Sequence, residues 1–486
     1  MSEVHADSNE RPRCVVMKFG GTSVEDAAAI RRLCQIVNGR LRYHPVVVVS
    51  ALAKVTDQLF AAGKTAAGGN LRTAHGILRE IQDRHFRIAR ELLSSDGGDI
   101  LLDILLKDLV QDFHAAFTVL ASISAAREFS LRAQDHLLAM GEHFSSKIVH
   151  SMLVQSGLDA VWVDAKECIV TDAAHTRATP LWKETNQRLE SLLGPLLGAG
   201  RISVLGGFAS STGDGVPTTL GRGGSDFSAA IVGAGLHASR IEIWTDVDGA
   251  MTTDPNLCSE ARCVGRMSFD EAAELAYFGA KVLHPSTLLP ARRQNIPVWV
   301  LNSRNPEGAG TEISAHSHDD GRVKALSVKR GVAVVDVEPV RWLAPELLRE
   351  VCEAFERYHH TLDLLSASHG SLSLLVTSTT SLPAIADELK GLANVRWENH
   401  KALVCLVGEK IRRRPEIASK VFRAIADIDV RLICQGASER NISFLVDESQ
   451  AEESIKRLHK VFFSSKSKPE PRVSRYALCQ SGETWQ

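Results

Sequence analysis

The chain has 486 residues, enough for about three domains, and 44% of them are hydrophobic against 23% charged, which excludes a disordered or fibrous protein. Lys plus Arg total 56 against 58 for Asp plus Glu, so the net charge of −2 gives no global attraction to nucleic acid or anionic membrane. Nine cysteines without a C-x-x-C pair favour reduced thiols in a cytoplasmic protein over a disulfide framework or a zinc site. The longest aliphatic run, residues 46–49, is far below the ~20 residues of a membrane helix, so we expect no membrane anchor.

The first three hundred residues alternate short β-branched runs with helical stretches. This alternation predicts an α/β domain with a largely parallel sheet. A mainly helical insert is expected at residues 52–130, and the clearest amphipathic helix at residues 130–151. The expected strands are residues 14–19, 45–50, 160–164, 201–205, 240–247 and 296–301.

Residues 305–321 are rich in Gly, Ser, His and Asp and are expected to form a linker. Beyond them the pattern changes to two successive βαββα units, which predicts two ferredoxin-like domains. The first has expected strands at 325–337, 361–365 and 371–377 and helices at 344–358 and 382–392. The second has expected strands at 402–407, 430–435 and 442–446 and helices at 415–425 and 451–462.

Several expected strands end in residues suited to binding an anion. Lys18 is followed by Gly20 and Gly21, where backbone N–H groups can approach phosphate oxygens while the ammonium supplies positive charge. Taken alone, this strand and turn are equally compatible with a tight βα turn and a solvated lysine. Because open α/β sheets bind ligands at the carboxyl ends of their strands, we expect a site at this edge.

A second glycine-rich segment, residues 206–226, ends in Arg222, Ser225 and Asp226 and leads into an alanine-rich helix. A flexible linker would explain the glycines, but amides at a helix entry beside an arginine favour an anion site. Arg can grip a carboxylate with two parallel hydrogen bonds. No His-Glu-x-x-His motif is present, so we expect no metal site formed by the protein.

Four ordered motifs resemble the aspartate kinases, which are members of the amino acid kinase family. The motifs are KFGGTSV at 18–24, TTLGRGGSD at 218–226, WTDV at 244–247 and FGAKVLHP at 278–285, and the similarity continues through residues 433–436 and 441–446. The chain is most similar to the monofunctional, lysine-sensitive type. The resemblance implies an amino acid kinase domain at 13–312, with a three-layer αβα fold, followed by ACT domains at 322–398 and 399–475, one of which is interrupted by the other in the family.

The resemblance implies ATP-dependent phosphorylation of the β-carboxylate of L-aspartate to 4-phospho-L-aspartate, the first step toward lysine, threonine and methionine. Magnesium would enter with the nucleotide. The acceptor carboxylate is already ionised at neutral pH because its pKa is ~3.9, so the absence of a general base does not count against the reaction.

Site residues are carried over from the family motifs onto matching positions. Lys18 and Asp226 are expected to be catalytic. Glu142 is expected to bind the α-ammonium of aspartate, and Arg222 its α-carboxylate. The remaining substrate-binding candidates are Ser50, Thr56, Gly223, Gly224 and Ser225. The nucleotide-binding candidates are Gly20, Gly21, Thr245, Asp246, Met251, Lys281 and Val282.

Two positions depart from the lysine-sensitive pattern in the nucleotide segment, where Met251 replaces a common Tyr and Asn256 a common Arg. In the ACT pair the expected effector residues are Thr361, Asp363 and Ser368, and the effector is expected to be an end-product amino acid, most plausibly lysine. Here His369 replaces a carboxylate of the pattern, which weakens the assignment of lysine. The resemblance also implies a homodimer or a dimer of dimers through the ACT domains.

Two other functions are compatible with the sequence. One is an acyl-phosphate-forming kinase that acts on glutamate or N-acetylglutamate, and the other is a non-catalytic amino-acid sensor that uses the ACT pair. The basic residues between 456 and 475 favour a solvated helix face over nucleic-acid binding, because few aromatic residues lie among them.

Overall fold

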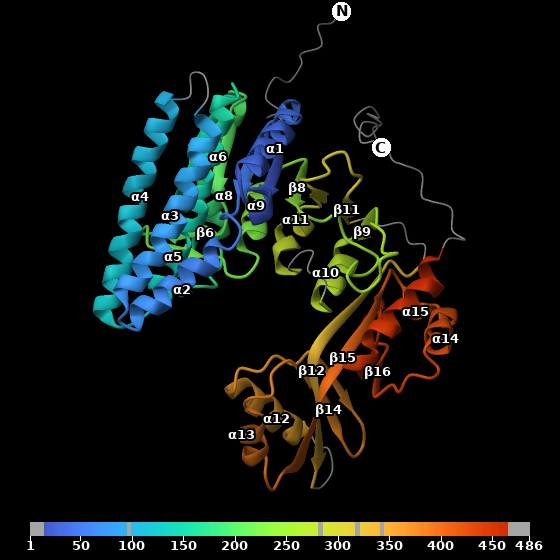
Figure 1. Ribbon diagram of the computed structural model, residues 1–486. Helices are drawn as coiled ribbons and strands as arrows, with labels where there is room; N and C mark the ends of the chain where they lie inside the picture. Colours follow the sequence, from blue (N-terminus) through green and yellow to red (C-terminus); the bar gives the residue numbers. More distant parts are fainter. Residues whose placement is uncertain (1–13, 95–98, 280–284, 316–320, 341–344, 465–486) are drawn as a thin grey trace, which may run out of the picture. The chain divides into compact units, whose positions relative to one another are not determined.

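The computed structural model describes residues 14–94, 99–279, 285–315, 321–340 and 345–464 and contains two compact units (Figure 1). The first unit takes in Met1–Ala250, Gly265–Ala272 and Val282–Ser317. The second takes in Met251–Val264, Ala273–Lys281 and His318–Gln486. Two segments inside the range 13–312 therefore belong to the second unit.

The first unit is built on an eight-stranded sheet in the order β3-β5-β2-β1-β8-β10-β11-β9. The first six strands in this order run parallel, and they are the six that the sequence predicts. β11 runs antiparallel to β10 and lies within the expected linker 305–321, so the linker prediction is wrong there. The strands are β1 (Val15–Phe19), β2 (Pro45–Val49), β3 (Ala160–Val163), β5 (Ile202–Gly206), β8 (Arg240–Thr245), β9 (Arg266–Ser268), β10 (Val298–Asn302) and β11 (Thr311–Ser314).

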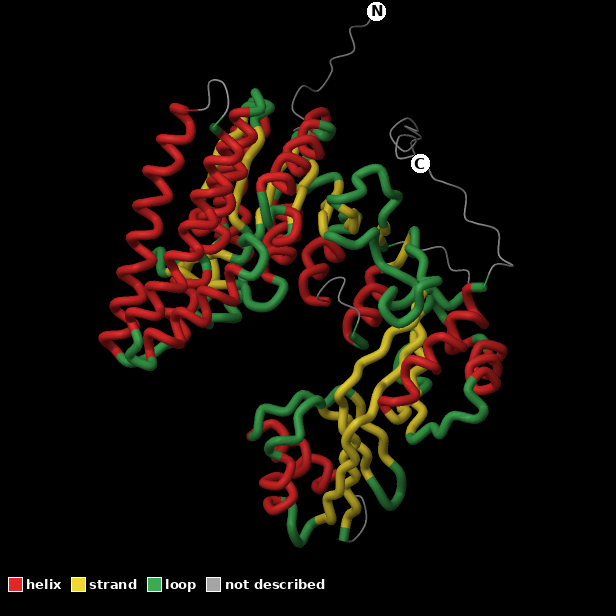
Figure 2. Tube along the Cα trace, viewed as in Figure 1, coloured by secondary structure: helices red, strands yellow, loops and turns green. Residues whose placement is uncertain are grey.

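Helices cover both faces of this sheet, because its central strands are buried on both faces (Figure 2). Along β1, Val15, Met17 and Phe19 join one hydrophobic cluster, whereas Val16 joins the other. This alternation confirms the three-layer αβα fold. The first layer contains α1 (Ala27–Asn38), α2 (Val55–Ala67), α3 (Leu71–Leu93), α4 (Asp99–Ala126) and α6 (Met140–Gln155), and the second α8 (Trp182–Gly198), α9 (Gly224–Gly235) and α11 (Leu289–Arg293).

The predicted helical insert is formed by α2, α3 and α4, of which α3 and α4 lie side by side (Figure 1). By length and composition alone, α4 could cross a membrane, although 28% of the tested window is buried inside the structure. Its inner residues Leu105, Leu109 and Phe113 belong to the cluster that packs on the sheet. One such helix is weak evidence for a membrane span, since core helices pass the same test.

The single helix expected at residues 130–151 is two helices, α5 (Leu131–Leu138) and α6, separated at Ala139. Just after this break, Gly141 packs so closely that a Cβ there would stand 3.0 Å from Ala51 Cβ. The apolar spacing continues across the break, which explains why the sequence pattern does not reveal it.

A small second sheet lies in the first unit, in the order β4-β6-β7. Its strands are β4 (Val170–Thr171), β6 (Ala209–Thr212) and β7 (Pro217–Thr219), and the short helix α7 (Ala165–Cys168) precedes β4. Part of the glycine-rich segment 206–226 is therefore strand rather than loop. β7 leads directly into the turn that carries Arg222.

The second unit contains a six-stranded antiparallel sheet in the order β13-β14-β12-β15-β17-β16. Two of its strands, β12 (Ala325–Pro339) and β15 (Ala393–Val407), have 15 residues each (Figure 1). The others are β13 (Leu364–Ala367), β14 (Leu372–Val376), β16 (Leu432–Cys434) and β17 (Asn441–Asp447). The helices are α12 (Pro345–Arg357), α13 (Leu382–Glu388), α14 (Pro415–Ala424) and α15 (Ala451–Phe463), and α10 (Phe269–Tyr277) has its last residues in this unit.

Each long strand of the second unit contributes to two separate hydrophobic clusters. One cluster combines the second half of β12 with the first residues of β15, β14, α12 and α13. The other combines the first half of β12 with the second half of β15, β17, α14 and α15. The division that we placed between residues 398 and 399 falls inside β15, so the two clusters interleave along the chain.

Candidate active site

In the first unit, several candidate site residues lie at the carboxyl ends of the parallel strands. Lys18 lies near the end of β1, Ser50 follows β2 directly, and Thr245 ends β8. The turn after β1 is fixed to this edge, since Gly20 N donates to Trp244 O at 3.0 Å and Ser50 N donates to Phe19 O at 3.0 Å. The parallel pairing of β2, β1 and β8 thus brings these segments together.

Lys18 pairs with Asp226 across the edge of the sheet. Residues two apart on a strand face the same side, so Lys18 faces the α9 layer as Val16 does. Asp226 is in the first turn of α9, and its Oδ1 lies 2.6 Å from Lys18 Nζ, with 10% and 18% of the two side chains exposed. A Cβ on Gly20 would stand 3.6 Å from the same ammonium. The positive charge is therefore held beside the glycine turn, where a phosphate can approach.

Glu142 comes from the first turn of α6 and is buried at the end of β5. Burial raises the pKa of Glu142 to about 8, and a backbone hydrogen bond from Ala51 and the charge of Lys18 act in the opposite direction. Its Oε2 has no hydrogen-bond partner in the described part of the chain. A buried carboxyl oxygen without a partner is costly unless a ligand satisfies it, and an ammonium group would do so.

Two glycines allow the elements around Glu142 and Asp226 to meet. A Cβ on Gly206 would stand 3.2 Å from Glu142 Cβ, and one on Gly207 would stand 2.7 Å from Ser225 Cβ. Any larger residue at 207 would push α9 away from the end of β5. The close packing brings the segments that carry Glu142, Ser225 and Asp226 to the same edge of the sheet.

The α9 entry has the backbone that its glycines predict. Gly223 has φ of 74°, in the left-handed region, and Gly224 begins the helix. A Cβ on Gly224 would lie 2.5 Å from Phe208 Cδ2, so this residue also needs to be small. The first turn of α9 therefore lies beside Lys18, which pairs with Asp226 of that turn, and its amides carry the partial positive charge of a helix N-terminus.

Arg222 differs from the other charged candidates because it is exposed and, among the described residues, forms no hydrogen bond or ion pair. Ser50 and Thr56 are partly buried, and Ser50 O accepts a hydrogen bond of 2.7 Å from Ser145 Oγ. Arg222 is thus available for a ligand, whereas the backbone of Ser50 serves to fix α6 to the end of β2.

The nucleotide candidates are only partly assembled in the first unit. Thr245 Oγ1 lies 3.2 Å from Asp246 Oδ1 at the end of β8, next to the Gly20 turn. Met251 belongs to the second unit, where it forms an antiparallel bridge with Cys263. Lys281 and Val282 lie outside the described residues.

The structure adds supporting residues that sequence patterns did not suggest. Arg84 of α3 donates to Ala53 O at 2.7 Å and to Glu25 O at 2.9 Å, which ties together the loops after β2 and β1. Ser303, after β10, lies 2.8 Å from Ser23 Oγ and donates to Thr245 O at 3.1 Å. Because both act mainly on backbone carbonyls of segments distant in the sequence, no motif identifies them.

The effector candidates lie in the second unit, and the strand there begins at Leu364 rather than at residue 361 as expected. Asp363 is therefore just before the strand, and both its carboxylate oxygens lie 2.7 Å from Lys329 Nζ. Ser368 is in the following turn, with its Oγ 2.9 Å from Ser371 Oγ, and Thr361 is exposed.

Comparison with known proteins agrees with this geometry. The model of the amino acid kinase family matches residues 13–302, and a model of an ACT domain matches residues 404–462. The lysine-sensitive aspartokinase 3 of Escherichia coli (strain K12) is 34% identical over 458 residues, which cover 92% of this chain and 99% of that protein. The chain belongs to the aspartokinases of the amino acid kinase family. The fold class and the resemblance stated above are confirmed.

Other relatives extend the same result. Aspartokinase 3, chloroplastic, of Arabidopsis thaliana is 34% identical over 477 residues, covering 94% of this chain and 83% of that protein. The crystal structure of E. coli aspartokinase III in complex with aspartate and ADP (R-state) has a TM-score of 0.80 and 33% identity, and covers 93% of this chain and 100% of that one. Its complex with lysine and aspartate (T-state) has a TM-score of 0.78 at 33% identity, and covers 93% and 99% of the two chains.

Proposed function

We propose that this aspartokinase transfers the γ-phosphoryl group of ATP to the β-carboxylate of L-aspartate, forming 4-phospho-L-aspartate and ADP. The observation that carries the proposal is the convergence, at one edge of the sheet, of Lys18, Asp226 and Glu142, whose Oε2 has no hydrogen-bond partner among the described residues. The structures of E. coli aspartokinase III with aspartate, ADP and lysine support the choice of ligands.

The reaction needs positioning and charge neutralisation more than proton transfer. An oxygen of the ionised β-carboxylate attacks the γ-phosphorus, and the bond from that phosphorus to the bridging oxygen breaks, so that ADP leaves with the electron pair. Lys18 stabilises the charge on the transferring group, helped by the amides of Gly20 and Gly21. Asp226 orients the Lys18 ammonium.

The two ends of the substrate are held by oppositely charged groups. Arg222 binds the α-carboxylate, and Glu142 accepts the α-ammonium and becomes ionised as it does so. Ser225, at the α9 entry, and the hydroxyls of Ser50 and Thr56 complete this pocket, together with the backbone of Gly223 and Gly224. Recognition at both ends favours a free amino acid over an N-acetylated one.

The nucleotide is proposed to lie along the end of β8, against Thr245 and Asp246. Met251, Lys281 and Val282 stay nucleotide-binding predictions from the family motifs. Magnesium enters with ATP. The asparagine at 256 lacks the positive charge that the lysine-sensitive pattern has there, and Asn256 instead donates to Asp254 Oδ1 at 3.0 Å.

Regulation and assembly are proposed for the second unit. We propose two ACT domains, near the predicted ranges 322–398 and 399–475 but interleaved along the chain. They bind an end-product amino acid, which we propose to be lysine, at Thr361, Asp363 and Ser368. We also propose a homodimer through these domains, since β13 and β16 end the sheet and expose Leu365 and Ile433. A cytoplasmic location stays a prediction from composition.

The test is the formation of an acyl phosphate, trapped with hydroxylamine, by the full chain with ATP and magnesium. Aspartate should give hydroxamate, and glutamate and N-acetylglutamate should give much less. Hydroxamate from glutamate but not from aspartate would overturn the substrate assignment. Equal ADP release by the wild type and a Lys18→Ala variant would instead favour an amino-acid sensor.

A further inference from the structure

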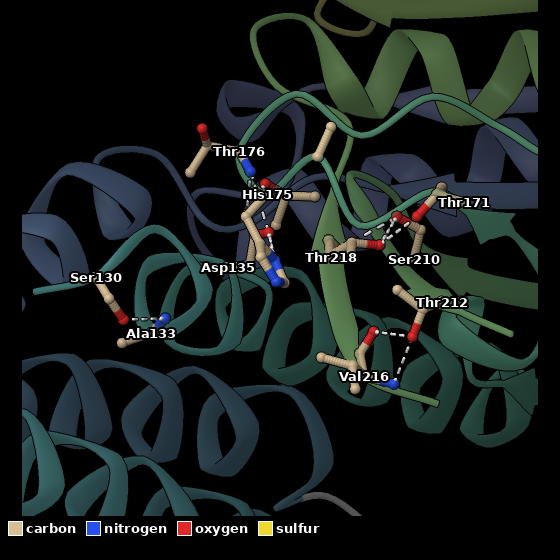
Figure 3. Close-up of polar contacts among 12 residues, drawn as sticks. Ser130, Ala133, Asp135, Thr171, His175, Thr176, Ser210, Thr212, Val216 and Thr218 are labelled. Atoms are coloured by element: carbon tan, nitrogen blue, oxygen red, sulfur yellow. Dashed lines mark hydrogen bonds and ion pairs between the residues drawn. The ribbon is translucent and has the colours of Figure 1, made fainter. Parts of the chain in front are cut away.

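A buried carboxylate outside the proposed catalytic residues connects three segments of the first unit. Asp135 of α5 is fully buried, and its oxygens accept hydrogen bonds from Thr176 N at 3.0 Å and from Thr219 Oγ1, while its Oδ2 lies 2.7 Å from His175 Nδ1 (Figure 3). The partners come from the loop after β4 and from the end of β7. One carboxylate therefore ties α5, this loop and β7 together.

The loop held by Asp135 lies against the turn that carries Arg222. Ala178 N donates to Thr219 O at 3.0 Å, so the loop continues the small sheet beside β7. Gly221 has φ of 74°, and a Cβ there would stand 2.9 Å from Thr176 O. The backbone of Thr176 thus touches the residue that immediately precedes Arg222.

The loop conformation is one that its sequence does not favour. Thr176 has φ of 68°, in the left-handed region that β-branched residues rarely adopt. Such a residue persists only where its surroundings over-determine it, and Asp135 accepts from its N–H with both oxygens. Without the carboxylate, the loop would have reason to relax toward an ordinary conformation.

The opposite face of the small sheet, to which Thr218 points, is already fixed by hydroxyls. Thr218 Oγ1 lies 2.6 Å from Thr171 Oγ1 and 2.9 Å from Ser210 Oγ, which joins the three strands (Figure 3). Asp135 therefore has little to add to the strands themselves. Its partners are the loop and Thr219, the last residue of β7, next to the turn that must aim Arg222 at its ligand.

We infer that Asp135 is a positioning residue for aspartate recognition: it holds the His175–Thr176 loop and Thr219 in place, and thereby fixes the turn that presents Arg222 to the α-carboxylate. This inference rests on the proposed function, because the ligand of Arg222 is assigned there. Asp135 does not touch the reacting atoms, so removing it should affect aspartate binding far more than the chemical step.

The first test is Asp135→Asn, which keeps the size of the side chain but removes its charge and leaves one acceptor oxygen where the carboxylate has two. We expect the KM for aspartate to rise about tenfold, because a factor of ten corresponds to the free energy of roughly one charged hydrogen bond. The kcat and the KM for ATP should each change less than about twofold. Thr219→Val, which removes one donor and preserves volume, should raise the same KM by a smaller factor and serves if Asp135→Asn does not fold.

A double-mutant cycle with Arg222→Ala separates positioning from general support. If Asp135 acts through Arg222, Asp135→Asn should have little further effect on the KM for aspartate once Arg222 is alanine. Thr176→Gly should partly restore the KM of Asp135→Asn, because glycine adopts a positive φ without strain. The inference would be overturned if the effects of Asp135→Asn and Arg222→Ala on the KM for aspartate were additive, or if Thr176→Gly gave no rescue. A fall in kcat as large as the rise in the KM for aspartate would also overturn it.

The cycle also distinguishes failure of this inference from failure of the proposed function. If Arg222→Ala raises the KM for aspartate but Asp135→Asn and Thr219→Val do not, the positioning role of Asp135 is wrong and the substrate assignment stands. If the wild type forms no aspartyl hydroxamate at all, the proposed function fails and the inference fails with it.

Discussion

The candidate catalytic edge and the candidate effector segment place carboxylates in opposite states. In the first unit, Glu142 is buried with an oxygen that has no hydrogen-bond partner among the described residues, and Arg222 is exposed without a hydrogen bond or ion pair among them. In the second unit, Asp363 is also largely buried, with 7% of its side chain exposed, but both its oxygens are paired with Lys329. The first site is open to an amino acid, and the second already holds an ammonium group.

This difference indicates how each site would bind a ligand. At Glu142 an incoming ammonium satisfies a group that is otherwise unpaired, so part of the cost of burial is already met by the fold. At Asp363 an effector ammonium must first displace Lys329, so binding is coupled to a rearrangement within the second unit. A catalytic site benefits from being ready, whereas a sensor benefits from an exchange of partners.

The largest expected effect on the candidate catalytic edge is that of removing Lys18. Lys18→Ala removes the charge at the edge of the sheet, and we expect kcat to fall about 10²–10³-fold, as when one oxyanion-type donor is lost. The KM for aspartate should change little, because the lysine acts on the phosphoryl group. Lys107→Ala, at an exposed position on α4, is the matched control. Hydroxamate assays at saturating substrates measure the ratio, and a variant with near wild-type kcat would contradict the assignment.

His85 shows that an unpaired buried atom need not indicate a ligand. Its Nε2 has no hydrogen-bond partner among the described residues, yet the ring packs edge-on against Phe113 and Phe144 in the helical layer. Burial lowers the pKa of His85 to about 4 from 6.5. The native state therefore resists protonation, and stability present above pH ~6.5 is lost as the pH falls toward 4, by up to about 3 kcal/mol.

On acidification from pH 7.5 to pH 5, the free energy of unfolding of the wild type should change less favourably than that of His85→Leu, by about 2 kcal/mol, because leucine has no proton to gain. The comparison between the two proteins cancels opposing contributions such as that of Glu142, whose raised pKa favours the folded state at lower pH. Urea unfolding at pH 7.5 and pH 5 measures it, with His114→Leu at an exposed position of α4 as the control. The catalytic rate at pH 7.5 should be nearly unchanged. If the variant loses as much stability on acidification as the wild type, another group is responsible.

A smaller effect is expected at the effector segment. Lys329→Met leaves Asp363 without its partner, and a largely buried unpaired carboxylate should attract an effector ammonium more strongly. The lysine concentration that gives half-inhibition should fall several-fold, roughly the 1 kcal/mol scale of a displaced ion pair. Lys390→Met, at an exposed position, is the control. An unchanged or higher concentration would show that Asp363 and Lys329 do not form the effector site.

The sequence predicted the fold best where burial is uniform. The six parallel strands were found from their runs of β-branched and apolar residues, and β1, β2 and β5 among them are buried on both faces. The first half of β15, residues 393–401, was missed because polar and charged residues occupy much of it. β6 and β7 were missed because a short pair of Ser- and Thr-rich strands between glycines looks like a loop.

The candidate site likewise contains residues that the sequence predicted and residues that it did not. Lys18, Glu142 and Asp226 were found through motifs, and the structure brings them together at one edge. Arg84, Ser303 and Asp135 act largely on backbone groups of segments distant in sequence, and such contacts leave no local pattern to read. The Lys329–Asp363 pair also joins residues that no spacing rule connects.

The central claim is that Glu142 is kept neutral, with its Oε2 lacking a hydrogen-bond partner among the described residues, until the substrate ammonium arrives. Burial raises the pKa of Glu142 to about 8, so at pH 7 the empty site holds a proton that must leave when the carboxylate pairs with aspartate. Calorimetric titration of aspartate at pH 7, in buffers of different ionisation enthalpy, counts that proton. We predict nearly one proton released per aspartate bound, and none for Glu142→Gln. Binding by the wild type without proton release would contradict the account.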